Sequence, residues 1–335
     1  MSKRRYSHSA RGETRSKVPF FARFSENGLL SVEVLTLAYM LITAVMTLVW
    51  WDNINRPEDM MVWRAGALAF MVLSNIIYHF YPSRFTITLR VVPLLLCLIQ
   101  WYPETYEFCK QFNYQDHIFA FCDWLIFGCQ PGVMMQQWLS SDAWYEAFCL
   151  GYYSYYYLMM LTIGFILFAR YDDFQRASFI FLGSFFLFYL IYEFLPVAGP
   201  QYYYCAIGLD RAQEAYFPEM GHYFVDHQDC LPVEDRGLFS RLVWAAHETG
   251  EHPTAAFPSS HVGMATISMM LAWQTRCRWL FWLQVPFYLL LVVSTVYVRA
   301  HYAIDSIAGL VFAFIFFGLM NGLWPGVRDL LRLKD

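Results

Sequence analysis

Residues 279–298, WLFWLQVPFYLLLVVSTVYV, and residues 302–322, YAIDSIAGLVFAFIFFGLMNG, are two apolar runs separated only by Arg299, Ala300 and His301. Each run has the roughly 20 apolar residues that a helix needs to cross a bilayer. Ionisable groups at membrane depth are costly, and they are tolerated best at helix ends. This stretch therefore predicts two spanning helices with a polar, ionisable junction.

The composition of the whole chain agrees with a membrane protein. Of the 335 residues, 58% are hydrophobic, 20% are aromatic and only 15% are charged, whereas soluble domains carry about 45–50% apolar and about 25% charged residues. These values exclude a disordered chain, a disulfide-rich secreted module and a typical cytosolic enzyme. The net charge of −4 argues against a nucleic-acid partner, which would select a basic face. We expect an all-α, polytopic helical bundle.

Further apolar runs predict six more spanning helices. The eight candidates are residues 29–51, 61–81, 86–102, 145–169, 177–195, 258–275, 279–298 and 302–322. The expected organisation is a cytoplasmic N-terminal tail (1–28), N-terminal helices (29–102), an intervening segment (103–144), a core (145–325) with an outer loop (196–257), and a cytoplasmic C-terminal tail (326–335). The intervening segment is apolar but broken by Gly128 and Pro131, which favours an interfacial or re-entrant structure.

The distribution of basic residues predicts the orientation. Lys and Arg accumulate in cytoplasmic loops, and with the N-terminus inside, 16 of the 23 basic residues fall on the cytoplasmic side. The outer loop 196–257 carries nine acidic residues against three arginines. Both termini are therefore expected in the cytoplasm.

The first candidate cluster is FPSSHVGMATISMM, residues 257–270. Pro258 suits a first helical turn, so the amides of Ser259, Ser260 and His261 are expected to point out of a helix N-terminus, where an anion binds. Two hydroxyl groups and an imidazole at such a place suit a phosphate ester. In the alternative interpretation the cluster has no catalytic role and is a serine N-cap followed by a histidine at the membrane interface.

The second candidate cluster is STVYVRAHYAIDSIAG, residues 294–309. On a helix, His301 and Asp305 would share one face, with about 5–6 Å between their Cβ atoms. A carboxylate bound to one ring nitrogen makes the other nitrogen a better nucleophile or base. A structural His–Asp pair is the alternative, but the nearby Arg299 weakens it. Together the two clusters contain a nucleophile, a second histidine for the leaving group and donors for phosphate oxygens.

The pattern P-S-S-H at 258–261, followed about forty residues later by R-x-H-Y-x-x-D at 299–305, resembles the phosphatidic acid phosphatase type 2 superfamily. The second motif of that superfamily is P-S-G-H and the third is S-R-x5-H-x3-D. The serine, histidine and aspartate of the third motif match Ser294, His301 and Asp305. The motif arginine falls on a threonine, so Arg299, one helical turn later, is expected to replace it if the helix continues. The resemblance implies a six-helix core.

Two further segments resemble the inositolphosphotransferase branch, which includes inositol phosphorylceramide synthases. The first motif K-x6-R-P is absent, and the proline-rich YEFLPVAGPQYYY stands in its place at 192–204. A D-x-x-x-F-G-x-x-P segment lies upstream, at 123–131. The resemblance covers roughly residues 120–322.

By this resemblance, His301 attacks the phosphorus of a lipid phosphodiester and forms a phosphohistidine. Asp305 orients His301, and His261 protonates the departing diacylglycerol and then activates the acceptor hydroxyl. A ceramide-type acceptor makes the enzyme a transferase, with phosphoinositol as the preferred headgroup, and water makes it a lipid phosphate phosphatase. A transporter is disfavoured because the ionisable groups gather at one face and no repeat is seen. Ethanolamine or choline as headgroup, and the oligomeric state, remain open.

Other residues are expected to support the site. The substrate- or phosphate-binding candidates are Arg299, Ser259, Ser260, Gln201, Glu193 and Tyr155. Glu193 needs a partner near the outer end of its helix, for which Arg299 is the candidate. Tyr155, or Tyr156, belongs to an aromatic run whose other members are expected to pack or to lie at the interface.

The expected partners are a phospholipid donor, a ceramide-type acceptor and the bilayer, with the site on the non-cytoplasmic face. No cofactor and no metal is expected, because HETGEH (247–252) has one residue too many for a H-E-x-x-H site. Cys205 and Cys230 share the outer loop and could pair if that loop faces an oxidising compartment.

Overall fold

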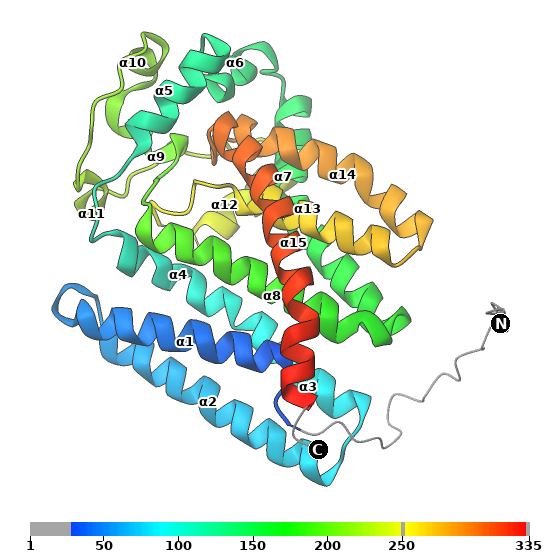
Figure 1. The fold of residues 1–335 in the computed structure, drawn as a ribbon. Coiled ribbons are helices and arrows are strands. Elements are labelled where there is room, and N and C mark those ends of the chain that lie inside the picture. Colours follow the sequence, from blue (N-terminus) through cyan, green and yellow to red (C-terminus); the bar gives the residue numbers. More distant parts are fainter. Residues whose placement is uncertain (1–27, 249–251, 333–335) are drawn as a thin grey trace, which may run out of the picture.

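The computed structural model describes residues 28–248 and 252–332. Within these ranges the chain is helical and contains no strand, which confirms the all-α prediction (Figure 1). Most of the predicted N-terminal tail lies outside the described residues. The predicted C-terminal tail begins as helix, because the last helix continues to Arg332.

Seven helical segments of the described chain are long and apolar enough to cross a membrane. They are α1 (Ser31–Val49), α2 (Pro57–Phe80), the consecutive helices α3 (Arg84–Leu96) and α4 (Leu98–Cys109), α7 (Asp142–Ala169), α8 (Tyr171–Phe194), α14 (Arg278–Tyr297) and α15 (Ala303–Arg332). Each of them overlaps one of the eight predicted spans. The bundle is therefore a multi-pass membrane fold.

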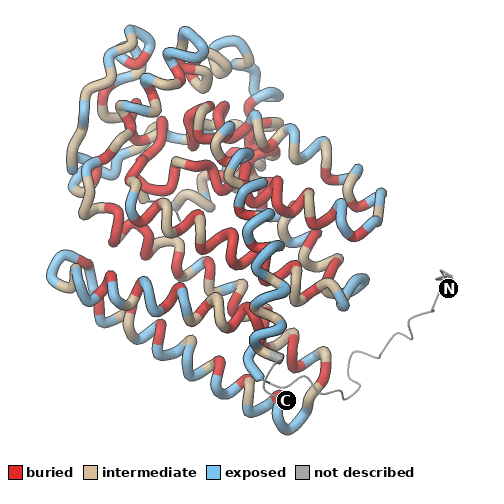
Figure 2. Tube along the Cα trace, viewed as in Figure 1, coloured by how far each residue is buried: buried red, intermediate tan, exposed pale blue. Residues whose placement is uncertain are grey.

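The predicted span 258–275 forms a shorter helix, α13 (Ser260–Gln274). Its 15 residues rise about 22 Å, less than the hydrocarbon core of about 30 Å. The helix packs against α7, α8, α14 and α15, and most of its residues are buried except at its C-terminal end (Figure 2). It is therefore a largely internal helix of the bundle.

The segment between α4 and α7 contains two helices, α5 (Asp116–Phe127) and α6 (Pro131–Trp138), bent by 59°. Gly128 ends α5 with a φ of 68°, and Pro131 is the first residue of α6. These are the two residues at which the sequence predicted a break. By length and composition the pair would serve as a broken span or as a re-entrant loop.

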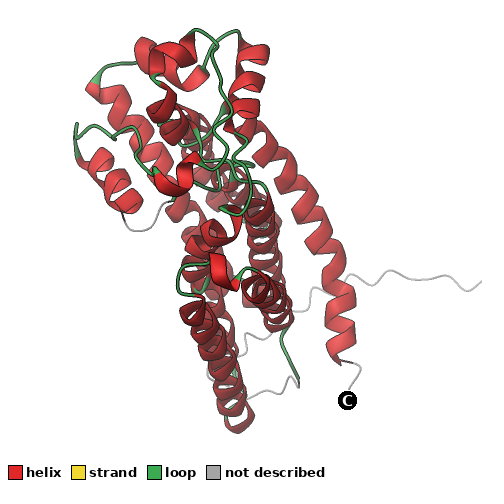
Figure 3. Cartoon of the chain, turned by 90° about the vertical axis from the view of Figure 1, so that its left-hand side faces the viewer, coloured by secondary structure: helices red, strands yellow, loops and turns green. Residues whose placement is uncertain are grey.

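Short helices follow α8; the first of them packs against α5, and the last packs against α7. They are α9 (Pro200–Ile207), α10 (Leu209–Gln213), α11 (Tyr223–Asp226) and α12 (Leu238–Glu248), and a single 3₁₀ turn, η1 (Trp51–Asn53), joins α1 to α2. In Figure 1 the labels of α5, α6, α9 and α10 group together, far from the C-terminus. Figure 3 shows most of the irregular backbone at the same end.

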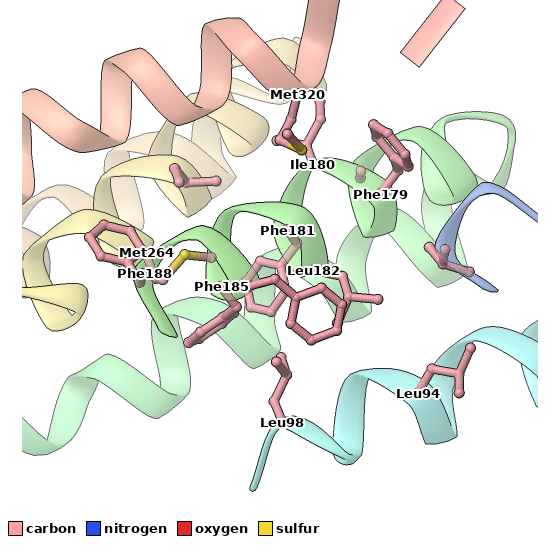
Figure 4. Close-up of a cluster of buried hydrophobic side chains, with 14 of the residues drawn as sticks. Leu94, Leu98, Phe179, Ile180, Phe181, Leu182, Phe185, Phe188, Met264 and Met320 are labelled. Carbon is pink, nitrogen blue, oxygen red and sulfur yellow. The ribbon is translucent and has the colours of Figure 1, made fainter. Parts of the chain in front are cut away.

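Helix α8 lies at the centre of the bundle, and 78% of its apolar window is buried. Its aromatic side chains contact residues from α3, α4, α13 and α15 (Figure 4). Because lipid tails are as apolar as leucine, helices in a bilayer associate through close packing, which small residues permit. A Cβ on Gly183 would clash with Met320, and one on Gly263 would clash with Phe188. These glycines let α15 and α13 approach α8.

Candidate active site

The first polar cluster lies where α13 begins. Ser259 is the N-cap of the helix, and its Oγ accepts a hydrogen bond from the Val262 N–H at 3.3 Å. The Ser259 N–H donates to the Asp305 carbonyl at 3.0 Å. Ser259 is fully buried, so it joins α13 to α15 and offers no amide to a phosphate, in contrast to the prediction. Pro258 precedes the cap and lies outside the first turn.

The His301 ring is held in a defined orientation. Its Nδ1 lies 2.7 Å from the carbonyl oxygen of Ala256, and its Nε2 lies 3.2 Å from Nδ1 of His261. A carbonyl only accepts, so the hydrogen-bond network assigns the proton of the ring to Nδ1. Burial lowers the pKa of His301 to about 4, so the ring is neutral at physiological pH. The lone pair of Nε2 accepts the hydrogen bond from His261, and it becomes available to an electrophile when that contact opens.

Asp305 does not orient the ring directly. Its Oδ2 is 3.9 Å from His301 Nδ1, beyond hydrogen-bond distance, and accepts from the Tyr302 N–H at 2.8 Å. The expected shared helix face does not exist, because α15 begins at Ala303, after His301. The carbonyl of Ala256 takes the orienting position, and Asp305 fixes the backbone beside His301.

The ring of His261 lies against two tyrosines of α7. Its centroid is 4.7 Å from that of Tyr152 and 4.4 Å from that of Tyr155. Tyr155 is 7% exposed and also interacts with Ser260, whereas Tyr156 is 41% exposed. The structure therefore brings Tyr155 to the site and leaves Tyr156 on the outside. Tyr152 belonged to the aromatic run in the sequence, but periodicity alone did not distinguish it.

Arg299 lies in the turn between α14 and α15. Helix α14 ends at Tyr297, and Arg299 adopts a left-handed φ of 64°. The helix does not continue through Arg299, so the condition under which Arg299 was expected to replace the motif arginine on the same helix face is not met. The Arg299 carbonyl accepts from the Gln201 N–H at 2.9 Å, so Gln201 joins the site through its backbone. The Nε atom of Arg299 is buried and has no hydrogen-bond partner, which leaves a donor for an anionic group.

Glu193 does not pair with Arg299. Its Oε1 accepts from the hydroxyl of Tyr39 at 2.8 Å, and the side chain is fully buried between α8 and the N-terminal helix α1. The predicted role in binding substrate is therefore not supported by its position. The partner came from a helix far away in sequence, which local patterns could not indicate.

Two carboxylates of α5 reach the backbone around His301. Asp116 accepts from the N–H groups of residues 198–199, and Asp123 accepts from those of residues 303–304. The sequence singled out Asp123 as part of a motif but not Asp116. The available signal was a spacing of seven residues between two carboxylates in an apolar segment, which places both on one helix face.

The outer loop shows neither a disulfide nor a metal cluster in its described part. Cys205 and Cys230 are not joined by a disulfide, and the Cys230 Sγ lies 3.5 Å from Nε2 of His247. Among the described residues, no three His, Cys, Asp or Glu side chains form a group that could hold a metal ion.

The fold and this site define a polytopic membrane protein in which two histidines touch at one end of a helical bundle, beside an arginine. The family model of the PAP2 superfamily matches residues 117–319, more than half of the chain, and the chain belongs to that superfamily. Its members are generally lipid phosphatases or phosphotransferases, so the protein is a membrane enzyme of this type. No curated protein and no solved structure gave a significant match. The matched region contains both histidines and excludes α1 to α4.

Proposed function

We propose that this enzyme transfers a phospho-headgroup, with phosphoinositol preferred, from a glycerophospholipid to a ceramide-type acceptor through a phosphohistidine on His301. The observation that carries the proposal is the hydrogen-bonded pair of His301 and His261. The proton of His301 is held at Nδ1 by Ala256, so Nε2 is available for bonding to phosphorus. A lipid phosphate phosphatase would use the same pair, with water as the acceptor.

The charges near the histidines favour a phosphodiester donor. Arg299 precedes His301 by two residues and brings one cation to this turn, whereas two carboxyl groups, Asp116 and Asp123, bind backbone N–H groups around the same turn. A phosphodiester carries one negative charge, and a phosphomonoester carries nearly two. The acidic surroundings therefore disfavour phosphatidic acid more than a phospholipid with an esterified headgroup.

In the first step, Nε2 of His301 attacks phosphorus and the bond from phosphorus to the diacylglycerol oxygen breaks. For this step His261 takes up a second proton when the anionic donor binds, and it gives that proton to the leaving oxygen, so diacylglycerol departs as a neutral alcohol. The headgroup phosphate stays on His301 as a phosphoramidate. The guanidinium of Arg299 balances the negative charge on the equatorial phosphate oxygens.

In the second step, the primary hydroxyl of the acceptor attacks phosphorus while neutral His261 takes its proton. The nitrogen–phosphorus bond breaks, and both histidines return to their starting protonation states. Two inversions give overall retention at phosphorus. The rings of Tyr152 and Tyr155 cover His261 with apolar surface, which supports an alcohol acceptor over water.

The contact between the two histidines has to open during the reaction. In-line displacement places the leaving oxygen opposite the attacking nitrogen, but Nδ1 of His261 now lies 3.2 Å from Nε2 of His301. The phosphate group must therefore separate the two rings when it binds. The resting enzyme thus keeps its nucleophile hydrogen-bonded until substrate replaces that bond.

The test is a reaction in vesicles that contain the purified protein, phosphatidylinositol and a fluorescent ceramide. We expect a new anionic sphingolipid and an equal amount of diacylglycerol. Parallel vesicles with phosphatidylethanolamine or phosphatidylcholine identify the headgroup, and EDTA should not reduce the rate. Release of inorganic phosphate from phosphatidic acid, without any sphingolipid product, would replace the transferase with the phosphatase.

We also propose that both termini are cytoplasmic and that the histidines lie at the opposite face. Arg170, Arg276 and Arg278 lie at the helix ends remote from His301, and the acidic outer loop lies at the same end as His301. A single cysteine introduced at the exposed Asp210 should react with an impermeant maleimide only from the non-cytoplasmic side. Labelling only from the cytoplasm would reverse the topology.

A further inference from the structure

In the proposed reaction, two buried carboxylates of α5 take no part in making or breaking bonds. Asp116 and Asp123 are each 1% exposed. Both lie on the same face of α5, since they are seven residues apart. Each side chain accepts hydrogen bonds from two consecutive backbone N–H groups, so neither presents a free face to substrate.

Asp123 caps α15 from another helix. Its Oδ2 accepts from the Ala303 N–H at 2.8 Å and its Oδ1 from the Ile304 N–H at 2.9 Å. These amides belong to the first turn of α15, where backbone donors have no partner within the helix. The capped residues begin only two positions after His301. Asp123 therefore holds the chain that follows the nucleophile.

Asp116 holds a loop whose hydrogen bonds lead to the carbonyl that orients the His301 ring. Its two oxygens accept from residues 198–199 at 2.9 and 2.8 Å. The preceding Val197 carbonyl accepts from the Ala256 N–H at 3.1 Å. The Ala256 carbonyl in turn accepts from Nδ1 of His301 at 2.7 Å. A continuous series of hydrogen bonds thus connects Asp116 to the ring.

Two further contacts tighten this arrangement. The Tyr302 hydroxyl donates to Oδ1 of Asp116 at 3.0 Å, so Asp116 also holds the residue after His301. Gly199 has a φ of 96°, and a Cβ at this position would lie 2.8 Å from the carbonyl oxygen of Ala300. Only glycine lets the loop bound by Asp116 approach the turn that carries His301.

We propose that Asp116 and Asp123 are positioning residues and that α5 is the frame that directs Nε2 of His301 into the site. Asp123 holds the chain that follows the nucleophile, and Asp116 holds the loop that supports the carbonyl on its ring. Neither carboxylate contacts the reacting atoms. The expected change in kcat rests on the proposed function, but the expected change in backbone hydrogen exchange does not. The inference also gives a role to α5, which precedes both histidine clusters in sequence.

Replacement by asparagine tests the two oxygens directly. Asparagine keeps one acceptor but turns an NH₂ group toward the second backbone N–H, so one hydrogen bond is lost and two donors face each other. A misplacement of about 1 Å costs on the order of 100-fold in rate. We expect Asp123→Asn to lower kcat by about 10- to 100-fold and to leave KM within about twofold.

The experiment compares Asp123→Asn and Asp116→Asn in vesicles, with Asp210→Asn on the exposed surface of α10 as the matched control. Hydrogen–deuterium exchange gives a second measurement that is independent of activity. Asp123→Asn should speed exchange at residues 303–304, and Asp116→Asn should speed it at residues 198–199. The control should change neither kcat nor these exchange rates.

Three results would overturn the inference: a folded Asp123→Asn with an unchanged kcat, a rise in KM at unchanged kcat, or unchanged exchange at residues 303–304. If the asparagine variants do not fold, Tyr302→Phe removes only one donor to Asp116 and should lower kcat several-fold. An unchanged kcat in that variant contradicts the role of Asp116. If the wild type transfers no headgroup, the proposed function fails, and the exchange pattern alone decides the positioning role.

Discussion

Ionisable side chains are buried in several parts of this bundle, and two of these parts differ in the partners that the side chains find. Around His301 they bind backbone groups of loops and helix ends, such as the Ala256 carbonyl and the first amides of α15. In the N-terminal half, one residue from each of α1, α2, α4 and α8 forms a cluster of side chains. Its pairs are Tyr39 with Glu193 at 2.8 Å and Arg64 with Glu104 at 2.7 Å.

The difference follows from where each group lies on its helix. Within a spanning helix the backbone groups already bond to one another, so a buried side chain depends mainly on other side chains, although Arg64 also donates from Nη1 to the Met60 carbonyl at 2.7 Å. The N-terminal cluster accordingly leaves Arg64 Nε, Glu104 Oε1 and Glu193 Oε2 without hydrogen bonds. At helix ends free amides and carbonyls are available, and they give the histidine site a defined tautomer. We therefore expect the histidine site to carry out chemistry and the N-terminal cluster to hold helices together.

The strongest test of this contrast is His301→Ala. Removing the nucleophile should abolish headgroup transfer, a loss of at least about 1000-fold. Wild-type protein incubated with headgroup-labelled donor and no acceptor should carry an acid-labile label, and the variant should carry none. Transfer at a normal rate by His301→Ala would eliminate the phosphohistidine.

The next largest effect is expected from His261→Ala. Loss of a general acid–base group costs about 100- to 10,000-fold in rate. Because the nucleophile remains, the variant should still react with a donor whose leaving group needs no protonation, such as a nitrophenyl phosphodiester. His227→Ala, which removes an exposed histidine stacked on Tyr223, is the matched control and should be unaffected. Equal losses with both donors would contradict the proton-donor role.

A smaller effect is expected from Arg299→Lys. Lysine keeps the charge but lacks the planar fork that binds two phosphate oxygens. We expect a loss of about tenfold in kcat/KM, on the order of 1.4 kcal/mol. The exposed Arg241→Lys serves as the control. Turnover near that of the wild type would mean that Arg299 acts only as a point charge.

The smallest effect on activity is expected from Glu193→Gln. Glutamine still accepts from Tyr39, so activity should stay within about twofold and thermal stability should be unchanged or higher. Tyr39→Phe, in contrast, leaves the carboxylate without its donor and should cost about 1–3 kcal/mol of stability. Unfolding in detergent micelles measures both. A large loss of activity in Glu193→Gln would mean that this residue takes part in substrate binding after all.

Much of the bundle could be predicted because its elements are local. Every spanning helix follows from a run of apolar residues, and Gly128 and Pro131 mark the bend between α5 and α6 by their own backbone preferences. The two histidines were also found locally, since ionisable groups between apolar runs are rare. The role of Arg299 was predicted on the condition that the helix continues through it, and that condition is not met, because nothing local signals the left-handed backbone at this residue.

The sequence by itself determined the membrane class, the helix positions and the residues able to carry phosphoryl chemistry, because hydrophobicity and residue type act within one segment. Only the tertiary structure decided which groups touch. The tertiary structure places the Ala256 carbonyl, and not Asp305, at hydrogen-bond distance from His301. It also pairs Glu193 with Tyr39, which is 154 positions away in the sequence. It also brought Asp116 and Asp123 to the turn around the nucleophile. Such contacts depend on how the helices pack across the bundle, and no spacing along the chain encodes them.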